Sequence, residues 1–257
     1  MGERTLDIAS HGVNLKNSAN TRELARVSVD FFRRAGFERM SYHHFPPGGA
    51  IDQYYAVVIN TYGFPDAWVA EYIKRRYHNN DPIIRLAGEL QHAFLWSECK
   101  NLGKLSPAEE HYLDRLAHSE IGDGYAVPVD GPHGRRAYIG LGFGDQPTIT
   151  DPGFVAQLQA ASYLGHCRYC ELLEAQLPQH QKLSPREVQA LGLMSQGMSN
   201  AEIAAEMNVS ANTAGTLVQR IFQKLDVHDR VSAVMRGTSV GLIPWDMVSS
   251  RKLNYSI

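Results

Sequence analysis

The chain has 257 residues, 44% of them hydrophobic, which is enough for one large domain or two modest domains with a sizeable core. Its formal net charge is -2, so it lacks the basic excess typical of proteins that bind nucleic acid mainly through charge. Three cysteines and an N-terminus without a long apolar run argue against a disulfide framework, a signal peptide and a membrane span, so we expect a cytoplasmic protein with no membrane partner.

The N-terminal region predicts a helix followed by a strand. Residues 1–20 are polar and mixed, and we expect them to be frayed. Residues 21–35 carry apolar side chains at helical spacing. Residues 37–45 alternate as in a strand, so the neighbours His43 and His44 point to opposite faces and cannot easily share a metal ion.

Aromatic residues gather in the next elements. A strand candidate at 53–60 precedes a helix at 65–77, which places Trp68 and Tyr72 one turn apart on the same face. Asp81 stands before a proline, and the helix must end there because the residue before proline is pushed out of the α region.

The following segments show the patterns of two helices and of an antiparallel pair of strands: 83–90, 106–119, 125–129 and 137–144. On the last strand, Tyr138 shares one face with Gly140 and two further glycines. A strand face of glycines leaves space above it, which either another element or a ligand must fill.

The polar stretch 177–182 interrupts a long helix predicted at 152–177, and we place a linker there. It separates a first domain of residues 1–176 from a second of residues 183–257. The element order of the first domain predicts an α+β fold, an antiparallel sheet with helices on both faces (an α-β-α sandwich). The second domain is predicted to be small and all-helical.

The second domain contains three helix starts with capping signals. Ser184, Ser199 and Ser210 each stand where a side chain can cap a helix, the first two with a glutamate three residues on. Two capped helices joined by a short turn describe a helix-turn-helix, which favours DNA binding. The alternative is a helical hairpin without a nucleic acid partner. The domain's seven basic and six acidic residues leave that alternative open.

A group of aromatic residues with one carboxylate indicates a candidate ligand site in the first domain. The group comprises Trp68, Tyr72, Asp81, Trp96 and Tyr138. Aromatic walls suit a small molecule that offers an N–H donor to Asp81. The alternative is an ordinary core in which Asp81 only accepts a turn hydrogen bond before Pro82.

Two sets of residues stand at spacings that carry a family resemblance. The first-domain set is Trp68, Tyr72, Asp81, Pro82, Trp96 and Gly124. The second-domain set is Glu187, Leu191 and Gly197, with the stretches 202–204 and 224–225. By these motifs the chain resembles the LuxR-type quorum-sensing transcriptional regulators, which join an acyl-homoserine-lactone-binding domain to a GerE-like helix-turn-helix.

The resemblance implies roles for the aromatic group. Asp81 would accept a hydrogen bond from the ligand amide, and Trp68 would donate its indole N–H to the lactone carbonyl. Tyr72 would contact the acyl amide, and Trp96 would cover the ring.

Three positions depart from the family pattern. Phe64 stands where the family often has tyrosine, and Ala126 and Gly140 stand where polar side chains commonly line the pocket. The lost hydroxyls and the added space over Gly140 imply a longer or bulkier acyl chain, or a non-lactone ligand.

The resemblance also implies a homodimer on an inverted-repeat operator. Gly215 and Gln219 stand where family members often have basic residues, so the helix that meets DNA is thinly charged. Base and phosphate contacts would then fall to the remaining polar and basic side chains of that helix: Asn212, Thr213, Thr216, Gln219, Arg220 and Lys224.

The sequence thus predicts a transcriptional regulator that responds to an N-acyl homoserine lactone or related molecule and needs no cofactor. One alternative is an antagonist or orphan regulator that acts by protein–protein contact or with a non-lactone ligand. Another is a lactone hydrolase with Asp81 as base. No Ser/His/Asp or His-rich constellation supports an enzyme, and Cys167 and Cys170 lack a second ligand pair, so we predict neither catalytic nor metal-binding residues.

Overall fold

The computed structural model describes residues 5–54, 59–178 and 181–243, which form two compact units. The first unit contains residues 5–45 and 59–176. Of the described residues, the second unit contains 46–54, 177–178 and 181–243. No helix in these described ranges is long and apolar enough to cross a bilayer.

A five-stranded antiparallel sheet in the order β2-β1-β5-β4-β3 forms the centre of the first unit. The strands are β1 Arg39–Phe45, β2 Ile59–Tyr62, β3 Phe94–Leu95, β4 Gly124–Asp130 and β5 Arg136–Gly142. In the pairing of β1 with β5, Ser41 lies opposite Gly140 and His43 opposite Tyr138. Side chains alternate along a strand, so these four residues share one face of the sheet.

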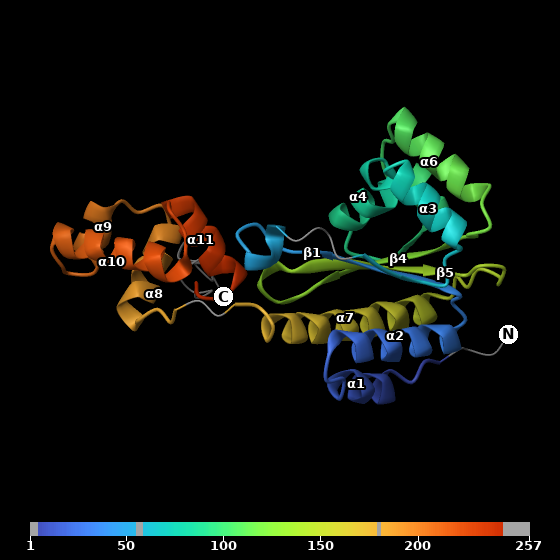
Figure 1. The fold of residues 1–257 in the computed structure, drawn as a ribbon, viewed down its shortest axis with the longest axis horizontal. Helices are drawn as coiled ribbons and strands as arrows, with labels where there is room; N and C mark the ends of the chain where they lie inside the picture. Colours follow the sequence, from blue (N-terminus) through green and yellow to red (C-terminus); the bar gives the residue numbers. More distant parts are fainter. Residues whose placement is uncertain (1–4, 55–58, 179–180, 244–257) are drawn as a thin grey trace, which may run out of the picture. The chain divides into compact units, whose positions relative to one another are not determined.

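Helices cover both faces of this sheet (Figure 1). One face carries α2 (Thr21–Ala35) and α7 (Pro152–Glu174), with α1 (Ile8–Lys16) packed on both. The other face carries α3 (Asp66–Lys74), α4 (Pro82–Glu89), α5 (Cys99–Leu102) and α6 (Pro107–Ala117). Short 3₁₀ turns are η1 Ile51–Tyr54, η2 Tyr77–Asn79, η3 Trp96–Glu98 and η4 Pro132–Gly134. The predicted α-β-α sandwich is therefore confirmed.

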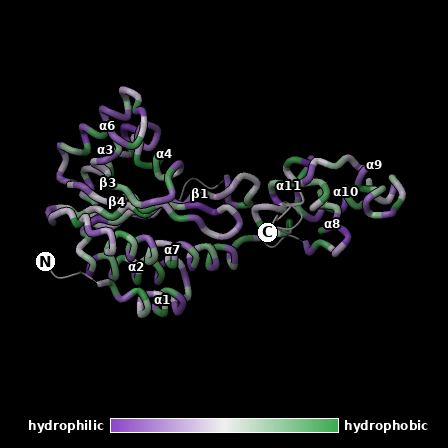
Figure 2. Tube along the Cα trace, turned by 180° about the vertical axis from the view of Figure 1, so that it is seen from behind, coloured by the Kyte–Doolittle hydropathy of each residue, from purple (hydrophilic) through white to green (hydrophobic). Residues whose placement is uncertain are grey.

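Each face of the sheet has its own hydrophobic core. Below α2 and α7 the core is rich in phenylalanine, including Phe31, Phe37 and Phe154. On the α3, α4 and α6 side the core contains Trp68 and Trp96 together with several tyrosines. Figure 2 shows hydrophobic segments in the strands and in the helices that cover them. The second core combines burial with hydroxyl and indole groups, which makes it the more suitable wall for a ligand.

The second unit is a helical bundle built around one core. Its helices are α8 Pro185–Ser195, α9 Asn200–Glu206, α10 Ala211–Leu225 and α11 Arg230–Ser239. The three predicted caps are confirmed, because the hydroxyls of Ser184, Ser199 and Ser210 each accept a hydrogen bond from the N–H three residues on. Helices α9 and α10 form the predicted helix-turn-helix.

Two expectations about the elements were wrong or incomplete, and one helix was not predicted. The N-terminal twenty residues are not frayed throughout: α1 is capped by Asp7 and buries His11 and Leu15 against α2 and α7. The second strand occupies β2 rather than 53–60, since residues 51–54 form η1 and residues 55–58 lie outside the described ranges. Helix α11 was not predicted. Residues 244–257 also lie outside those ranges.

Candidate functional site

The aromatic residues of the first-domain motif surround one cavity between the sheet and helices α3, α4 and α6. Its volume is about 250 Å³. Six predicted ligand residues line it: Phe64, Trp68, Tyr72, Asp81, Trp96 and Tyr138. Others that line it include Ser41, His43, Thr61, Ile83, Tyr112 and Ile121. The motif spacing therefore describes a single site in space.

Asp81 is the only carboxylate among the described residues that line this cavity. It is the N-cap of α4, where Oδ1 accepts from the Ile83 N–H at 2.9 Å, and Oδ2 accepts from the Tyr72 hydroxyl at 3.0 Å. Burial raises the pKa of Asp81 to about 6, and hydrogen bonds from Ile83, Tyr72, Tyr112 and the Ile84 N–H oppose the rise only in part. The carboxylate would therefore gain from a further N–H donor.

Arg115 holds Trp68 in the cavity wall through a cation–π contact and through an ion pair with Glu71. The Arg115 guanidinium lies 5.9 Å from the Trp68 ring centroid. Two of its nitrogens contact the Glu71 carboxylate, at 3.0 and 2.7 Å, and Glu71 also accepts from the Tyr77 hydroxyl. Because Glu71 and Trp68 are both on α3 while Arg115 is on α6, this network fixes the two helices around the cavity.

Trp96 fills the glycine face of the sheet. Its Cη2 lies 2.8 Å from the position that a Cβ would take on Gly124 and 3.0 Å from that on Gly142. The distance at Gly124 is too short for a Cβ and the distance at Gly142 is tighter than most Cβ contacts, so glycine at these positions allows the indole to lie on the sheet. The Trp96 Nε1 is buried and has no hydrogen-bond partner in the described part of the chain. A ligand acceptor would remove that cost.

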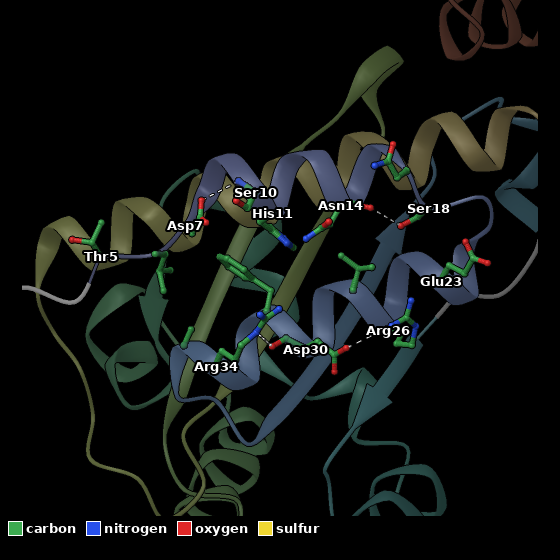
Figure 3. Close-up of a pocket in the computed structure, with 15 residues that line it drawn as sticks. Thr5, Asp7, Ser10, His11, Asn14, Ser18, Glu23, Arg26, Asp30 and Arg34 are labelled. Atoms are coloured by element: carbon green, nitrogen blue, oxygen red, sulfur yellow. Dashed lines mark hydrogen bonds and ion pairs between the residues drawn. The ribbon is translucent and has the colours of Figure 1, made fainter.

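Two other hollows in the first unit have a different character. One, of about 560 Å³, lies between α1 and α2 (Figure 3). Figure 3 shows polar side chains from both helices around it, among them Asp7 and Arg34. The other is an open groove of about 660 Å³ along α2, α7 and the far face of the sheet. None of the motif residues lines either hollow, so the aromatic cavity is the best candidate site.

In the second unit, five of the six predicted DNA contacts are exposed along α10: Asn212, Thr213, Thr216, Gln219 and Arg220. Lys224 differs from them. Its ammonium donates to the Glu187 carboxylate at 2.7 Å, and the Glu187 side chain is only 3% exposed. Burial alone would raise the pKa of Glu187, but hydrogen bonds from Lys224 and Ser184 outweigh it and lower that pKa. Lys224 is therefore engaged within the domain's own fold, which disfavours its predicted role as a phosphate contact.

Family models match both units. The autoinducer binding domain matches residues 20–169, and the luxR family of bacterial regulatory proteins matches residues 181–236. The chain is a LuxR-family regulator with an autoinducer-binding domain.

The similar proteins agree with this assignment. The transcriptional activator BjaR1 of Bradyrhizobium diazoefficiens is 28% identical over 203 residues, covering 79% of this chain and 82% of BjaR1. The quorum-sensing-dependent regulator RpaR of Rhodopseudomonas palustris is 26% identical over 181 residues, covering 70% and 73%.

Solved structures show the same fold. The crystal structure of Escherichia coli SdiA superposes with a TM-score of 0.72 at 17% identity, covering 92% of this chain and 98% of SdiA. A second SdiA structure, in complex with octanoyl-rac-glycerol, gives 0.72 at 14% identity, covering 94% and 99%. The family consists of transcriptional regulators rather than enzymes. Among the described residues, no group of three His, Cys, Asp or Glu is placed to hold a metal ion.

Two predicted ligand positions of this LuxR-family chain do not line the cavity, namely Ala126 and Gly140. Ala126 is fully buried in the core of the same face. A Cβ on Gly140 would overlap the Ser41 hydroxyl of the neighbouring strand. The expected space over Gly140 is thus filled by Ser41 and by Trp96, and the inference of a longer acyl chain loses its basis.

Sequence reasoning missed several cavity residues, above all Ser41, His43 and Tyr112. The alternation of residues 37–45 placed Ser41 and His43 on one strand face. It could not tell which face looks toward the cavity, because that depends on the pairing of β1 with β5. Tyr112 had only its place on a predicted helix as a signal.

Proposed function

We propose that this LuxR-family regulator binds an N-acyl homoserine lactone in the aromatic cavity and acts as a homodimer on an inverted-repeat DNA site. The observation that carries the proposal is Asp81, a buried carboxylate at the edge of an aromatic cavity with its pKa raised to about 6. An amide N–H is a fitting partner, since it supplies a hydrogen bond without a second buried charge.

The aromatic side chains would divide the remaining contacts. Trp68, held by Arg115, would offer its indole N–H to the lactone carbonyl, and Tyr72, whose hydroxyl donates to Asp81, would contact the acyl amide. Trp96 would cover the ring from the sheet side and could donate its unpaired Nε1–H. These roles fit the donors and acceptors of each side chain.

Ligand binding would stabilise the folded chain. Burial disfavours the ionised form of Asp81 despite its hydrogen bonds, and the Trp96 N–H has no acceptor among the described residues. A ligand that binds only the folded state at one hundred times its Kd adds about 2.7 kcal/mol of stability. We infer that the autoinducer signal is transmitted in part as increased stability of the first domain.

DNA contact would come from α10. Its exposed polar side chains Asn212, Thr213, Thr216 and Gln219 would meet base edges, and Arg220 would meet a phosphate. With Lys224 engaged by Glu187, each copy offers little charge, so two recognition helices on one operator are needed for tight binding. We further propose that residues 177–182 link the two domains.

A lactone panel with the purified full chain tests the proposal. Thermal unfolding, sedimentation and a gel shift on inverted-repeat DNA are measured with and without each lactone. We expect at least one lactone to raise the melting temperature and to increase dimer binding to DNA. If melting temperature and DNA binding are indifferent to every lactone, the proposal of a lactone sensor fails.

A non-lactone ligand is the second candidate. The fold neighbour SdiA was solved with octanoyl-rac-glycerol, which is a glycerol ester and not a lactone. Monoacylglycerols therefore belong in the same panel. If the chain binds another regulator but binds DNA with no ligand, the result would instead support an antagonist that acts by protein–protein contact. The low positive charge of α10 is compatible with that role.

A further inference from the structure

His43 is a buried ring on the cavity floor that none of the proposed ligand contacts uses. It lies on β1 opposite Tyr138 of β5, and the two rings stack with centroids 4.2 Å apart and planes at 18°. The side chain is 4% exposed and lines the cavity. Its Nδ1 is buried and has no hydrogen-bond partner in the described ranges of the chain.

This imidazole is neutral at physiological pH, because burial lowers the pKa of His43 to about 3. A neutral imidazole has one N–H donor and one nitrogen acceptor, and either can fall on Nδ1. An unpaired ring nitrogen in an apolar site costs free energy whichever tautomer is present. A simple stacking role would be served equally well by an aromatic ring without nitrogen, so the nitrogen indicates a polar partner.

The position of His43 indicates which part of a ligand it meets. Asp81 and Trp68 come from the helices that cover the cavity, whereas His43 and Ser41 come from the sheet. A ligand whose amide bonds to Asp81 therefore directs another part toward the sheet. The volume of about 250 Å³ is below the usual range of about 300–1,000 Å³, so that part is short.

We propose that His43 selects ligands with a short acyl group that carries a hydroxyl remote from the amide. A hydroxyl both donates and accepts, so it pairs with Nδ1 in either tautomer. This inference rests on the proposed lactone site and specifies the acyl class that the site takes. The neighbour Ser41, whose hydroxyl lies over Gly140, adds a second polar group on the same floor.

The test compares two probes on the full chain by isothermal titration: N-hexanoyl homoserine lactone and its terminally hydroxylated analogue. The wild type is expected to bind the hydroxylated probe about ten-fold more tightly, the effect of one neutral hydrogen bond. His43→Leu removes the nitrogens at similar bulk and should abolish or reverse this preference. His44→Leu is the matched control, because His44 is equally buried on the same strand but points to the other face.

The possible outcomes separate the two proposals. Equal affinity of the wild type for both probes overturns the role of His43 while leaving the lactone site intact. Binding of neither probe, with no other lactone bound, refutes the lactone site itself. If His43→Leu does not fold, the wild-type preference remains decisive, together with the ring-nitrogen resonance of His43, which must move with the hydroxylated probe and not with the parent.

Discussion

Replacing Asp81 by asparagine should stabilise the ligand-free chain and weaken ligand binding at the same time. Burial raises the pKa of Asp81 from 3.8 to about 6, so the fold disfavours its ionised form. Two pKa units correspond to about 3 kcal/mol at pH 7. Asparagine keeps the shape and can still cap α4 through the Ile83 N–H. We expect Asp81→Asn to raise the free energy of unfolding at pH 7 by about 1–3 kcal/mol.

The dependence on pH has a definite sign. Because the pKa in the folded state is the higher one, the contribution of Asp81 to stability is fully present below pH 3.8 and is lost as the pH rises through 6. Urea unfolding of the wild-type chain should therefore show this component between pH 4 and pH 7, and Asp81→Asn should lack it. The control is Asp66→Asn, an exposed carboxylate in the first turn of α3.

The affinity of Asp81→Asn for the ligand should fall, although the stability of the ligand-free variant rises. An amide N–H that donates to a carboxylate contributes about 1.5–3 kcal/mol, so Asp81→Asn should lose about ten- to one-hundred-fold in affinity. Stabilisation of the ligand-free chain together with weaker binding is the expected pair of results. Parallel pH curves for wild type and variant, or a ligand-free variant destabilised by more than about 1 kcal/mol, would refute the assignment of the pKa to burial.

Four further changes follow from the same structure. Wild-type affinity for the lactone should fall as the pH drops below 6, because protonated Asp81 accepts the amide N–H more weakly than the carboxylate does; calorimetry across that range checks it. Gly142→Ala should cost about 1–3 kcal/mol and shift tryptophan fluorescence, since the methyl would lie 3.0 Å from the Trp96 ring; unchanged unfolding would contradict the contact. Gly215→Ala should add about 1 kcal/mol of stability, because alanine has the higher helix propensity and, apart from the nearby backbone of α10 itself, no described atom lies within 4 Å of the new Cβ; a loss of stability in urea unfolding would count against this. Lys224→Met should cost about 3 kcal/mol by leaving buried Glu187 without its counter-charge, and Glu187→Gln in the same chain should recover much of it.

The helix starts could be predicted from sequence because a cap depends on three or four consecutive residues. Ser184 and Ser199 form complete capping boxes, with each glutamate accepting from the serine N–H at 2.7 Å. Helix α1 could not be predicted this way, because it buries only His11 and Leu15 and depends on packing against α2 and α7. Helix α11 buries small residues such as Ala233 and Gly237, which give no apolar periodicity.

The candidate site was predicted where its residues stand at fixed spacing along the chain and was missed where it depends on strand register. Trp68, Tyr72 and Asp81, which stand at fixed spacing in the sequence, line the same cavity in the structure. The predicted open space over Gly140 is absent, because the pairing of β1 with β5 places Ser41 over this glycine. No local pattern in either segment specifies that register, which the fold of the whole sheet determines.

Three polar groups of the cavity, on Asp81, Trp96 and His43, lower the stability of the ligand-free fold because they are buried at a cost. This cost explains how a small molecule could control the chain. Asp81 carries a burial cost of about 3 kcal/mol at pH 7, and two buried nitrogens, of Trp96 and His43, have no partner within the described ranges. These costs reduce the stability of the ligand-free fold, and a ligand with the matching donors and acceptors removes them. A ligand at one hundred times its Kd contributes about 2.7 kcal/mol, close to the cost at Asp81 alone. Since folded domains have only about 5–15 kcal/mol of stability, a change of this size is large enough to decide how much folded regulator is present.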